Sequence, residues 1–419
     1  MPSIAHASRI FVSLWGRRVG VLVPVPRHGV FAFRYDPAFL ASGIEIAPLA
    51  MPLRREPYAF PDLPKEDFGG LPPVFADSLP DSFGAGLVDF WLAERGLERR
   101  DITSLDRLAY IGRRGMGALC YEPERGPRAL PFALELRALV ESARRAANGE
   151  LSSLAGDDAL RVIVRLGSSA GGAQAKAVVG WNRKDGRFAF GDGTLPEGFE
   201  HWIVKFTPRE YPWRGERELA MHEAATAAGI RTAESCLVEA DGIRHFATRR
   251  FDRDGCVRHH MLSFAALAHV PPGAPPEHRA YERLFVAADE LGLPWEDREE
   301  LFRRMAFNVL AEECDDHPKN FSFLLREGGA WRLAPAYDLT GSDFPPEDPW
   351  SAHRGRHQMS VCGKFSGIGD DDLLRVADRF GIGTAASVLE RVREAQKAFD
   401  KNSKRAPLKE TSISIWKTP

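Results

Sequence analysis

A short polar stretch, EECDDHPKNFSFLL at residues 312–325, gathers side chains that could do chemistry immediately before an apolar, strand-like run. A carboxylate such as that of Asp315 can accept a proton from a hydroxyl group. Oxygens of Asp and Asn side chains bind hard cations such as Mg²⁺, which are usually shared with phosphate oxygens. Asp and Asn also favour ordinary surface loops, so this stretch alone does not distinguish a catalytic loop from a solvated one.

A predicted hairpin joins this stretch to a second acid. The apolar runs FSFLL and WRLAPAY flank REGG, which predicts a turn near Gly328 and Gly329. Asn320 lies nine residues before Gly329 and Asp338 nine after it, so the hairpin would bring their oxygens together at its open end. Asp315 precedes Asn320 with four residues between them, which is the spacing of the catalytic loop of protein kinases. The pattern predicts Asp315 as the base, and Asn320 and Asp338 as Mg²⁺ ligands.

Phosphoryl transfer also needs a loop that holds phosphate groups. The segment RLGSSAGGAQAK supplies small residues, including Gly171 and Gly172, which let backbone N–H groups approach phosphates, and two hydroxyl groups at Ser168 and Ser169. It is not a Walker A sequence, because Ala173 stands where that motif requires lysine. The alternative is a tight turn between two strands.

A lysine inside an apolar strand is the second expected part. Lys205 lies within HWIVKF, where it needs an acidic partner or an anionic ligand unless its ammonium group reaches the surface. The following helix offers Glu218 as that partner, as in the lysine–glutamate pair of kinases. Lys319 could neutralise further phosphate charge. The segment FATRRFDR, which contains Phe251, is expected to form the hinge whose backbone meets an adenine.

Length and composition indicate a globular protein of several units. The chain has 419 residues, 44% hydrophobic and 27% charged, with a net charge of −2, so nothing demands direct binding to nucleic acid or to an anionic membrane. We expect an α+β, two-lobed architecture with an N-terminal α+β unit at 1–150, a strand-rich unit at 151–255, a mainly helical unit at 256–405 and a loose tail at 406–419. Scattered cysteines, and no run of about 18 apolar residues, favour a cytoplasmic protein.

With these residues identified, the chain resembles the HipA family, the serine/threonine kinase toxins of bacterial HipBA-type toxin–antitoxin modules. The resemblance is spread over most of the chain and follows the family order. The blocks that carry it are LPPVFADSLPDSFG, LAYIGRRGMGALCYEP, SSAGGAQAK, HWIVKF, RRFDR, DDHPKNFS, LAPAYDLT and MSVCGK. It implies a two-lobed, protein-kinase-like region with a HipA-type N-terminal subdomain in front of it.

The resemblance also implies an activity and partners. Its cofactors would be ATP and Mg²⁺, and its substrate an aminoacyl-tRNA synthetase or another translation protein. Ser169, with Ser168 as a second candidate, would be autophosphorylated, and the added charge of about −1.5 to −2 would switch off nucleotide binding. A helix-turn-helix antitoxin similar to HipB would bind the chain and link it to operator DNA. Ala175 departs from the family, since many members have Glu there, and the C-terminal segment matches poorly.

Two alternatives belong to other functional classes. One is a catalytically weak co-repressor that binds the antitoxin, which the four intact positions Asp315, Asn320, Asp338 and Lys205 argue against. The other is a metal-dependent hydrolase built on Asp315, Asp316 and His317, which leaves Lys205 and the serine loop unexplained. In the kinase interpretation Asp316 is expected to be a bystander, because only Asp315 has the four-residue gap.

Overall fold

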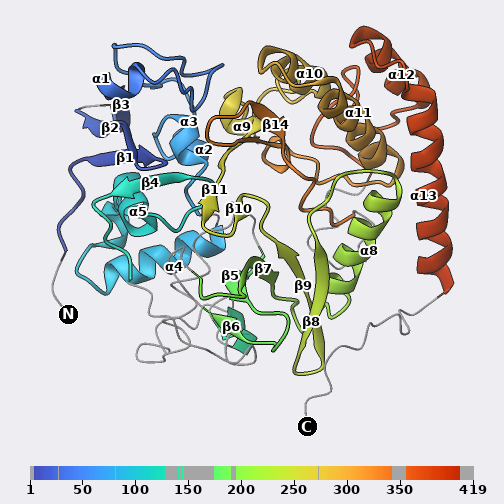
Figure 1. Ribbon diagram of the computed structural model, residues 1–419, viewed down its shortest axis with the longest axis horizontal. Helices are drawn as coiled ribbons and strands as arrows, with labels where there is room; N and C mark the ends of the chain where they lie inside the picture. Colours follow the sequence, from blue (N-terminus) through green and yellow to red (C-terminus); the bar gives the residue numbers. More distant parts are fainter. Residues whose placement is uncertain are drawn as a thin grey trace.

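The computed structural model describes most of the chain between residues 4 and 405. The described parts are 4–26, 28–80, 82–127, 140–141, 143–145, 174–189, 195–271, 273–341 and 355–405. Residues 165–173 of the segment RLGSSAGGAQAK and the tail 406–419 lie outside them. Helices and strands are mixed along the described chain, as the predicted α+β class requires (Figure 1).

The N-terminal region is built on a four-stranded antiparallel sheet with the strand order β3-β2-β1-β4. Ile10, Val12 and Leu14 are fully buried and alternate with half-buried positions, as expected of a strand with one face against the core. The elements of this region are β1 (Ile10–Leu14), β2 (Arg17–Val25), β3 (Val30–Tyr35), α1 (Pro37–Leu40), α2 (Lys65–Phe68), α3 (Pro73–Ala76), α4 (Ser82–Ala93), η1 (Arg99–Asp101), α5 (Ser104–Ile111) and β4 (Leu119–Glu122).

A five-stranded antiparallel sheet follows, with the order β6-β5-β7-β9-β8, and helix α8 packs against its last two strands. A hairpin joins β8 to β9 at Asp241 and Gly242, and both residues have positive φ, as a tight two-residue turn of this kind requires. The elements are β5 (Lys176–Trp181), β6 (Phe188–Ala189), β7 (Glu200–Lys205), α8 (Arg214–Ala227), β8 (Ser235–Ala240) and β9 (Ile243–Arg249).

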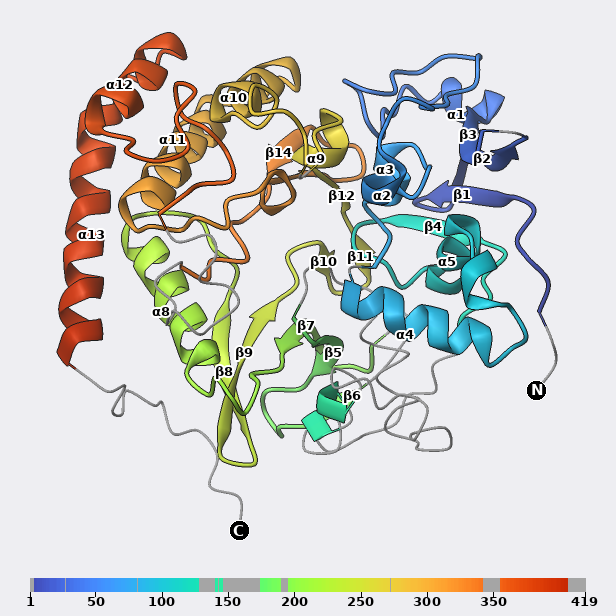
Figure 2. The same cartoon turned by 180° about the vertical axis from the view of Figure 1, so that it is seen from behind.

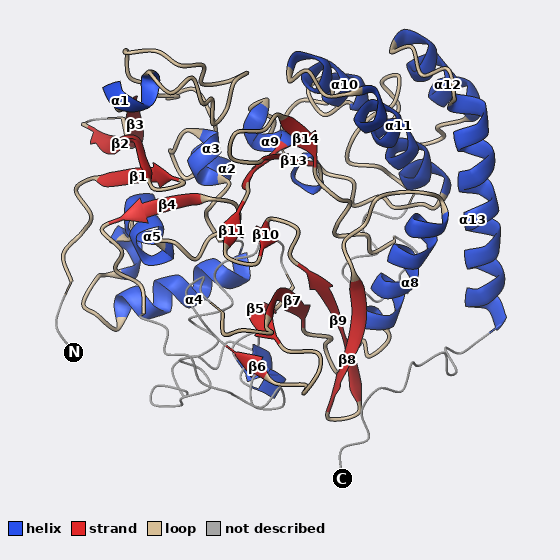
Figure 3. Cartoon of the chain, in the orientation of Figure 1, coloured by secondary structure: helices blue, strands red, loops and turns tan. Residues whose placement is uncertain are grey.

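The rest of the chain is mainly helical and includes one small sheet with the order β12-β13-β14. Helices α10 to α13 gather at the end of the molecule opposite the N-terminal sheet (Figure 3), and α13 packs against both α8 and α11. The elements are β10 (Arg253–Asp254), β11 (Val257–Arg258), β12 (His260–Ser263), α9 (Phe264–Leu267), α10 (Tyr281–Glu290), α11 (Trp295–Leu310), η3 (Pro318–Asn320), β13 (Ser322–Leu325), β14 (Trp331–Leu333), α12 (Asp370–Arg379) and α13 (Ala385–Arg405).

A buried charge cluster joins the N-terminal region to the remainder of the molecule. The carboxylate of Asp252, which is fully buried, pairs with Arg250 at 2.7 Å and with Arg253 at 2.6 Å. It also accepts the backbone N–H of Gly117 at 2.7 Å, while Arg253 donates to the carbonyl group of Gly115 at 2.9 Å. Burial opposes ionisation of Asp252, but the two arginines outweigh it and hold its pKa below the usual range.

Three further contacts also join the N-terminal region to the rest of the molecule. Asp77 accepts the backbone N–H and the hydroxyl group of Ser263, each at 2.7 Å, and so fixes the N-cap of α9 to the N-terminal region. The Trp15 indole donates to the carbonyl group of Arg258 at 2.8 Å. Arg258 in turn donates to the carbonyl group of Leu119, which keeps β11 beside β4 (Figure 2). The blocks FADSLP, GRRGMGALC and RRFDR therefore meet at one interface.

The cluster predicts a large stability cost for Asp252→Asn. The substitution leaves two buried guanidinium groups without a counter-charge, so we expect the free energy of unfolding to fall by about 3–5 kcal/mol. Urea unfolding of both proteins measures it. The matched control is Glu200→Gln, which breaks an exposed 3.0 Å pair with Arg249 and should cost less than about 1 kcal/mol. Equal, small costs for the two variants would contradict a structural role for the cluster.

Candidate active site

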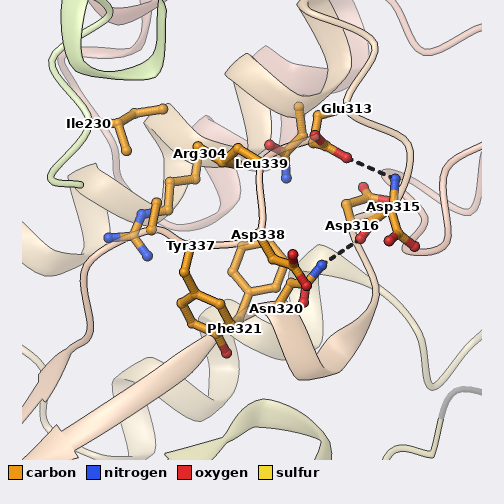
Figure 4. Close-up of a pocket in the computed structure, with 12 residues that line it drawn as sticks. Ile230, Arg304, Glu313, Asp315, Asp316, Asn320, Phe321, Tyr337, Asp338 and Leu339 are labelled. Carbon is orange, nitrogen blue, oxygen red and sulfur yellow. Dashed lines mark hydrogen bonds between the residues drawn. The ribbon is translucent and has the colours of Figure 1, made fainter. Parts of the chain in front are cut away.

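The loop between α11 and β13 carries the proposed base and one proposed metal ligand. After Ala311 ends the helix, the chain runs through Asp315 into the short 3-10 helix η3, whose last residue is Asn320. The Asn320 amide donates from Nδ2 to the carbonyl oxygen of Asp315 at 2.7 Å, which closes the loop on itself. Asp315, Asn320 and Asp338 line the same pocket (Figure 4).

The hairpin brings Asp338 to this loop by a different route from the predicted one. The ladder between β13 and β14 ends at the pair Phe323 and Leu333, five residues before Asp338. Tyr337 then anchors the returning chain, because its hydroxyl group donates to the carbonyl oxygen of Lys319 and contacts Ser322 Oγ at 2.6 Å. Asp338 itself has a φ of 59°, in the left-handed region. Convergence with Asn320 therefore depends on the tyrosine and on this backbone turn, not on continued strand pairing.

Lys205 supplies the positive charge of the site. It lies at the end of β7 and is buried, and its ammonium group contacts Glu218 on α8 at 2.5 Å and also the carboxylate of Asp338. The expected partner, Glu218, is thus in place, and a second acid shares the same ammonium group. One cation ties together a strand, a helix and the loop after β14.

Burial and the shared lysine set the protonation of the two acids that contact Lys205, namely Glu218 and Asp338. Burial opposes ionisation of Asp338, but Lys205 and then Lys176 outweigh it and hold the pKa of Asp338 below its usual range. Burial raises the pKa of Glu218 to about 7, although Lys205 acts in the opposite direction. Asp338 therefore stays ionised at neutral pH, as a cation ligand must be.

The donor set fits Mg²⁺. Because Asn320 uses its Nδ2 on the loop, its Oδ1 is the atom left to act as a ligand, and Asp338 adds an ionised carboxylate. Two such oxygens suit a cation that keeps several waters and shares phosphate oxygens with a nucleotide. Among the described residues, no group of three or more His, Cys, Asp or Glu side chains could hold a metal ion by itself.

Glu313 is a buried acid that the sequence analysis missed. Its Oε1 accepts the backbone N–H of Asp315 at 3.1 Å, and its Oε2 accepts those of Thr340 at 2.6 Å and Gly341 at 2.5 Å. One side chain thus connects the loop of the proposed base to the segment that follows Asp338. Burial raises the pKa of Glu313 to about 8, although the N–H groups of Gly341 and Thr340 lower it. Its place two residues before Asp315, in a run with Glu312, was the only signal in the sequence.

Asp316 is not the bystander that we expected. Its side chain is buried and accepts hydrogen bonds from the hydroxyl group of Tyr281 at 2.8 Å and the backbone N–H of Gln358 at 2.7 Å. Its Oδ2 also lies 3.1 Å from His357 Nδ1. An acid engaged in this way is an anchor for the loop. This arrangement gives no support to the hydrolase alternative, in which Asp316 would bind a metal ion together with His317.

The other site residues predicted from the sequence are either outside the described ranges or lie where no contact tests their role. Ser168, Ser169, Gly171 and Gly172 lie outside the described residues. Lys319 is exposed, and it is its carbonyl group that contacts Tyr337. The half-buried Phe251 has its ring centroid 5.6 Å from that of Tyr337, the residue before Asp338. The roles assigned to these residues stay predictions.

Lys176 is a further buried cation near the site that was not singled out from the sequence. It stands directly opposite Lys205 in the antiparallel pair of β5 and β7, so both side chains project from the same face of the sheet. It is one of the charges that lower the pKa of Asp338. Its position at the end of the block SSAGGAQAK was the available signal.

Comparisons with known proteins identify the family of this chain. The family model of the HipA N-terminal domain matches residues 10–122, and that of the HipA-like C-terminal domain matches residues 168–402. A protein of Sinorhizobium fredii (strain NBRC 101917 / NGR234) named "Putative kinase Y4mE" is 28% identical over 372 residues, 83% of this chain and 80% of that protein. A "Putative kinase" of Haemophilus influenzae is 29% identical over 161 residues, 35% of this chain and 47% of that protein.

A solved structure shows the fold. It is that of HipA in the complex of Shewanella oneidensis MR-1 HipA, HipB and operator DNA, with a TM-score of 0.64 and 18% sequence identity. The match covers 96% of this chain and 92% of that chain. The expected fold class, a kinase-like region with an additional N-terminal subdomain, is confirmed.

The three hydrogen bonds that Glu313 accepts lead to a prediction about stability. Glu313→Ala leaves three backbone N–H groups, two of them buried, without this acceptor, so the free energy of unfolding should fall by about 2–4 kcal/mol. Thermal and urea unfolding measure the change. Glu327→Ala, at an exposed position in the β13–β14 turn, is the matched control and should change stability by about 0.5 kcal/mol or less. If both variants unfold like the unaltered protein, Glu313 does not hold the two segments together.

Proposed function

We propose, from the premise that this chain belongs to the HipA family, that it is an ATP- and Mg²⁺-dependent serine/threonine protein kinase and the toxin of a toxin–antitoxin module. The observation that carries the proposal is the convergence on one site of Asp315 and Asn320 from one loop, Asp338 from the segment after β14 and Lys205 from β7.

Each side chain has a definite role in this proposal. Bound Mg²⁺·ATP would supply the phosphoryl group and neutralise charge on it. Asp315 would accept the proton of the substrate hydroxyl group, while Asn320 and Asp338 would hold the metal ion. Lys205, kept in place by Glu218, would offer its ammonium group to the phosphates. Phe251 and the backbone beside it would meet the adenine.

The proposed partners rest on family resemblance. The similar structure from Shewanella oneidensis is a complex with HipB and operator DNA, which supports a HipB-like helix-turn-helix antitoxin as the partner here and contact with operator DNA through it. We propose an aminoacyl-tRNA synthetase or another translation protein of the bacterial cytoplasm as the substrate. None of the helices in the described ranges has the length and apolar character needed to cross a membrane.

Phosphorylation of its own serine loop would regulate the kinase. A phosphate on Ser169 or Ser168 adds about −1.5 to −2 charges at neutral pH. The site already holds the acids Asp315 and Asp338, and each would repel that charge. The modified loop would therefore not remain at the nucleotide site.

The first prediction of this proposal concerns phosphate transfer. Unphosphorylated protein incubated with ATP and Mg²⁺ should gain one phosphate, about 80 Da by the mass of the group, on Ser169 or Ser168. Intact-mass and peptide mass spectrometry locate it, and omission of Mg²⁺ should prevent it. Asp315→Asn protein serves as the inactive control. A chain that gains no phosphate and transfers none to other proteins would fit the co-repressor alternative instead.

The second prediction concerns growth. Asp315→Asn removes the proposed proton acceptor, and loss of such a group typically slows a reaction by about 10²–10⁴-fold. Induced expression of this variant should no longer arrest bacterial growth, although it folds and still binds the antitoxin. Asp371→Asn, at an exposed position in the first turn of α12, should remain toxic. Full growth arrest by a folded Asp315→Asn protein is incompatible with Asp315 as the base.

A further inference from the structure

A third segment of the chain reaches the proposed base. Gln358 lies between β14 and α12, 43 residues after Asp315, in the stretch HQMSVCGK. Its side-chain amide donates from Nε2 to Asp315 Oδ1 at 2.6 Å. A donor this close to an ionised carboxylate forms a charge-assisted hydrogen bond, which is stronger than one between neutral groups. The contact therefore restricts rotation of the Asp315 carboxylate.

The backbone of Gln358 is itself fixed to the catalytic loop. Its N–H donates to Asp316 Oδ1 at 2.7 Å, and the neighbouring His357 Nδ1 lies 3.1 Å from Asp316 Oδ2. The hydroxyl group of Tyr281 donates to the same Oδ2, and Asn308 Nδ2 donates to that hydroxyl oxygen at 2.9 Å. Asp316, His357 and Asn308 are buried, so this network is shielded from water.

The segment that carries Gln358 is also fixed two residues later, at Ser360. The backbone N–H of Ser360 donates to the carbonyl group of Arg279 at 2.8 Å, and the backbone N–H of Tyr281 donates to the carbonyl group of Ser360 at 3.0 Å. These two bonds form a bridge between the start of α10 and the stretch that carries Gln358. The amide of Gln358 is thus delivered to Asp315 from a backbone that is fixed at both Gln358 and Ser360.

We propose that Gln358 is a positioning residue for phosphoryl transfer and that Asp316 is its anchor. This inference rests on the proposed function, in which Asp315 is the base. By holding Oδ1, the amide sets the plane of the carboxylate and the direction in which its second oxygen meets a substrate hydroxyl group. An amide performs this task without the positive charge of Lys or Arg, which would weaken Asp315 as a proton acceptor.

The role predicts a loss of rate without a loss of nucleotide binding. Gln358→Met keeps the length of the side chain and the backbone N–H to Asp316, but it removes the donor to Asp315. The rate constant of autophosphorylation at saturating ATP should fall about 10- to 100-fold, because small errors in the placement of a reacting group cost this much. The ATP concentration that gives half the maximal rate should stay within about twofold, because the proposed nucleotide ligands are unchanged.

Two further variants separate positioning from general stability. Gln358→Glu has nearly the same shape but places a carboxylate against that of Asp315, so its rate should fall further than that of Gln358→Met. Ser360→Ala changes the same segment without touching Asp315 and should keep the full rate. Gln358→Met and Ser360→Ala should keep a melting temperature close to that of the unaltered chain, because the backbone bonds of the segment are retained and Ser360→Ala loses only the 3.3 Å hydrogen bond from Ser360 Oγ to the carbonyl group of Arg279.

The outcomes are distinguishable. If the unaltered protein transfers phosphate and Gln358→Met transfers it equally fast, the positioning role is wrong while the proposed function stands. The positioning role is also wrong if the fall in rate comes with a clear fall in melting temperature, or with a loss of apparent ATP affinity by the same factor. Either result would indicate a purely structural role for Gln358. If the unaltered protein transfers no phosphate to itself or to other proteins, the proposed function fails, and this inference fails with it.

Discussion

The buried ammonium group of Lys205 is the contact on which the arrangement of the site depends. It pairs with Glu218 from α8 and with Asp338 from the loop after β14, while Lys205 itself belongs to β7. An unpaired charge at a buried position costs several kcal/mol, about 3–5 when one partner of a buried pair is removed. The sheet, the helix and the hairpin must therefore adopt one mutual arrangement. That arrangement also leaves Asp338 ionised beside Asn320, as binding of a cation requires.

A second constraint acts on the backbone of the catalytic loop. The residues proposed to do chemistry, Asp315, Asn320 and Asp338, are half-buried, whereas the acids that hold them, Glu313 and Asp316, are buried. Within one short stretch, neighbouring acids thus differ in burial and in task. The buried acids accept hydrogen bonds mainly from backbone N–H groups and so fix the backbone of the loop. The half-buried ones line the same pocket (Figure 4) and keep some surface exposed, where a substrate can reach them.

The sequence was sufficient for the parts of the site that depend on local spacing. Asp315 and Asn320 are on one loop, and the pairing of Lys205 with Glu218 joins consecutive elements, so motif spacing and strand pattern indicated them. Partners far apart in the chain left no such signal. Gln358 and Asp315 are 43 residues apart, and nothing in the pattern of either segment relates the two. The hairpin was predicted, but the anchoring of its open end by Tyr337 depends on a side-chain contact that the alternation of apolar residues does not encode.

The contacts between the N-terminal region and the rest of the molecule reach the proposed active site. Arg250 and Asp252 are locked to the N-terminal region through the backbone of Gly115 and Gly117, and Phe251 lies between them in the chain. The ring of Phe251 is near Tyr337, which immediately precedes Asp338. Two buried ion pairs therefore fix the backbone on both sides of the residue expected to meet the adenine. Loosening of the N-terminal region would shift this backbone, so that region is coupled structurally to the proposed nucleotide site.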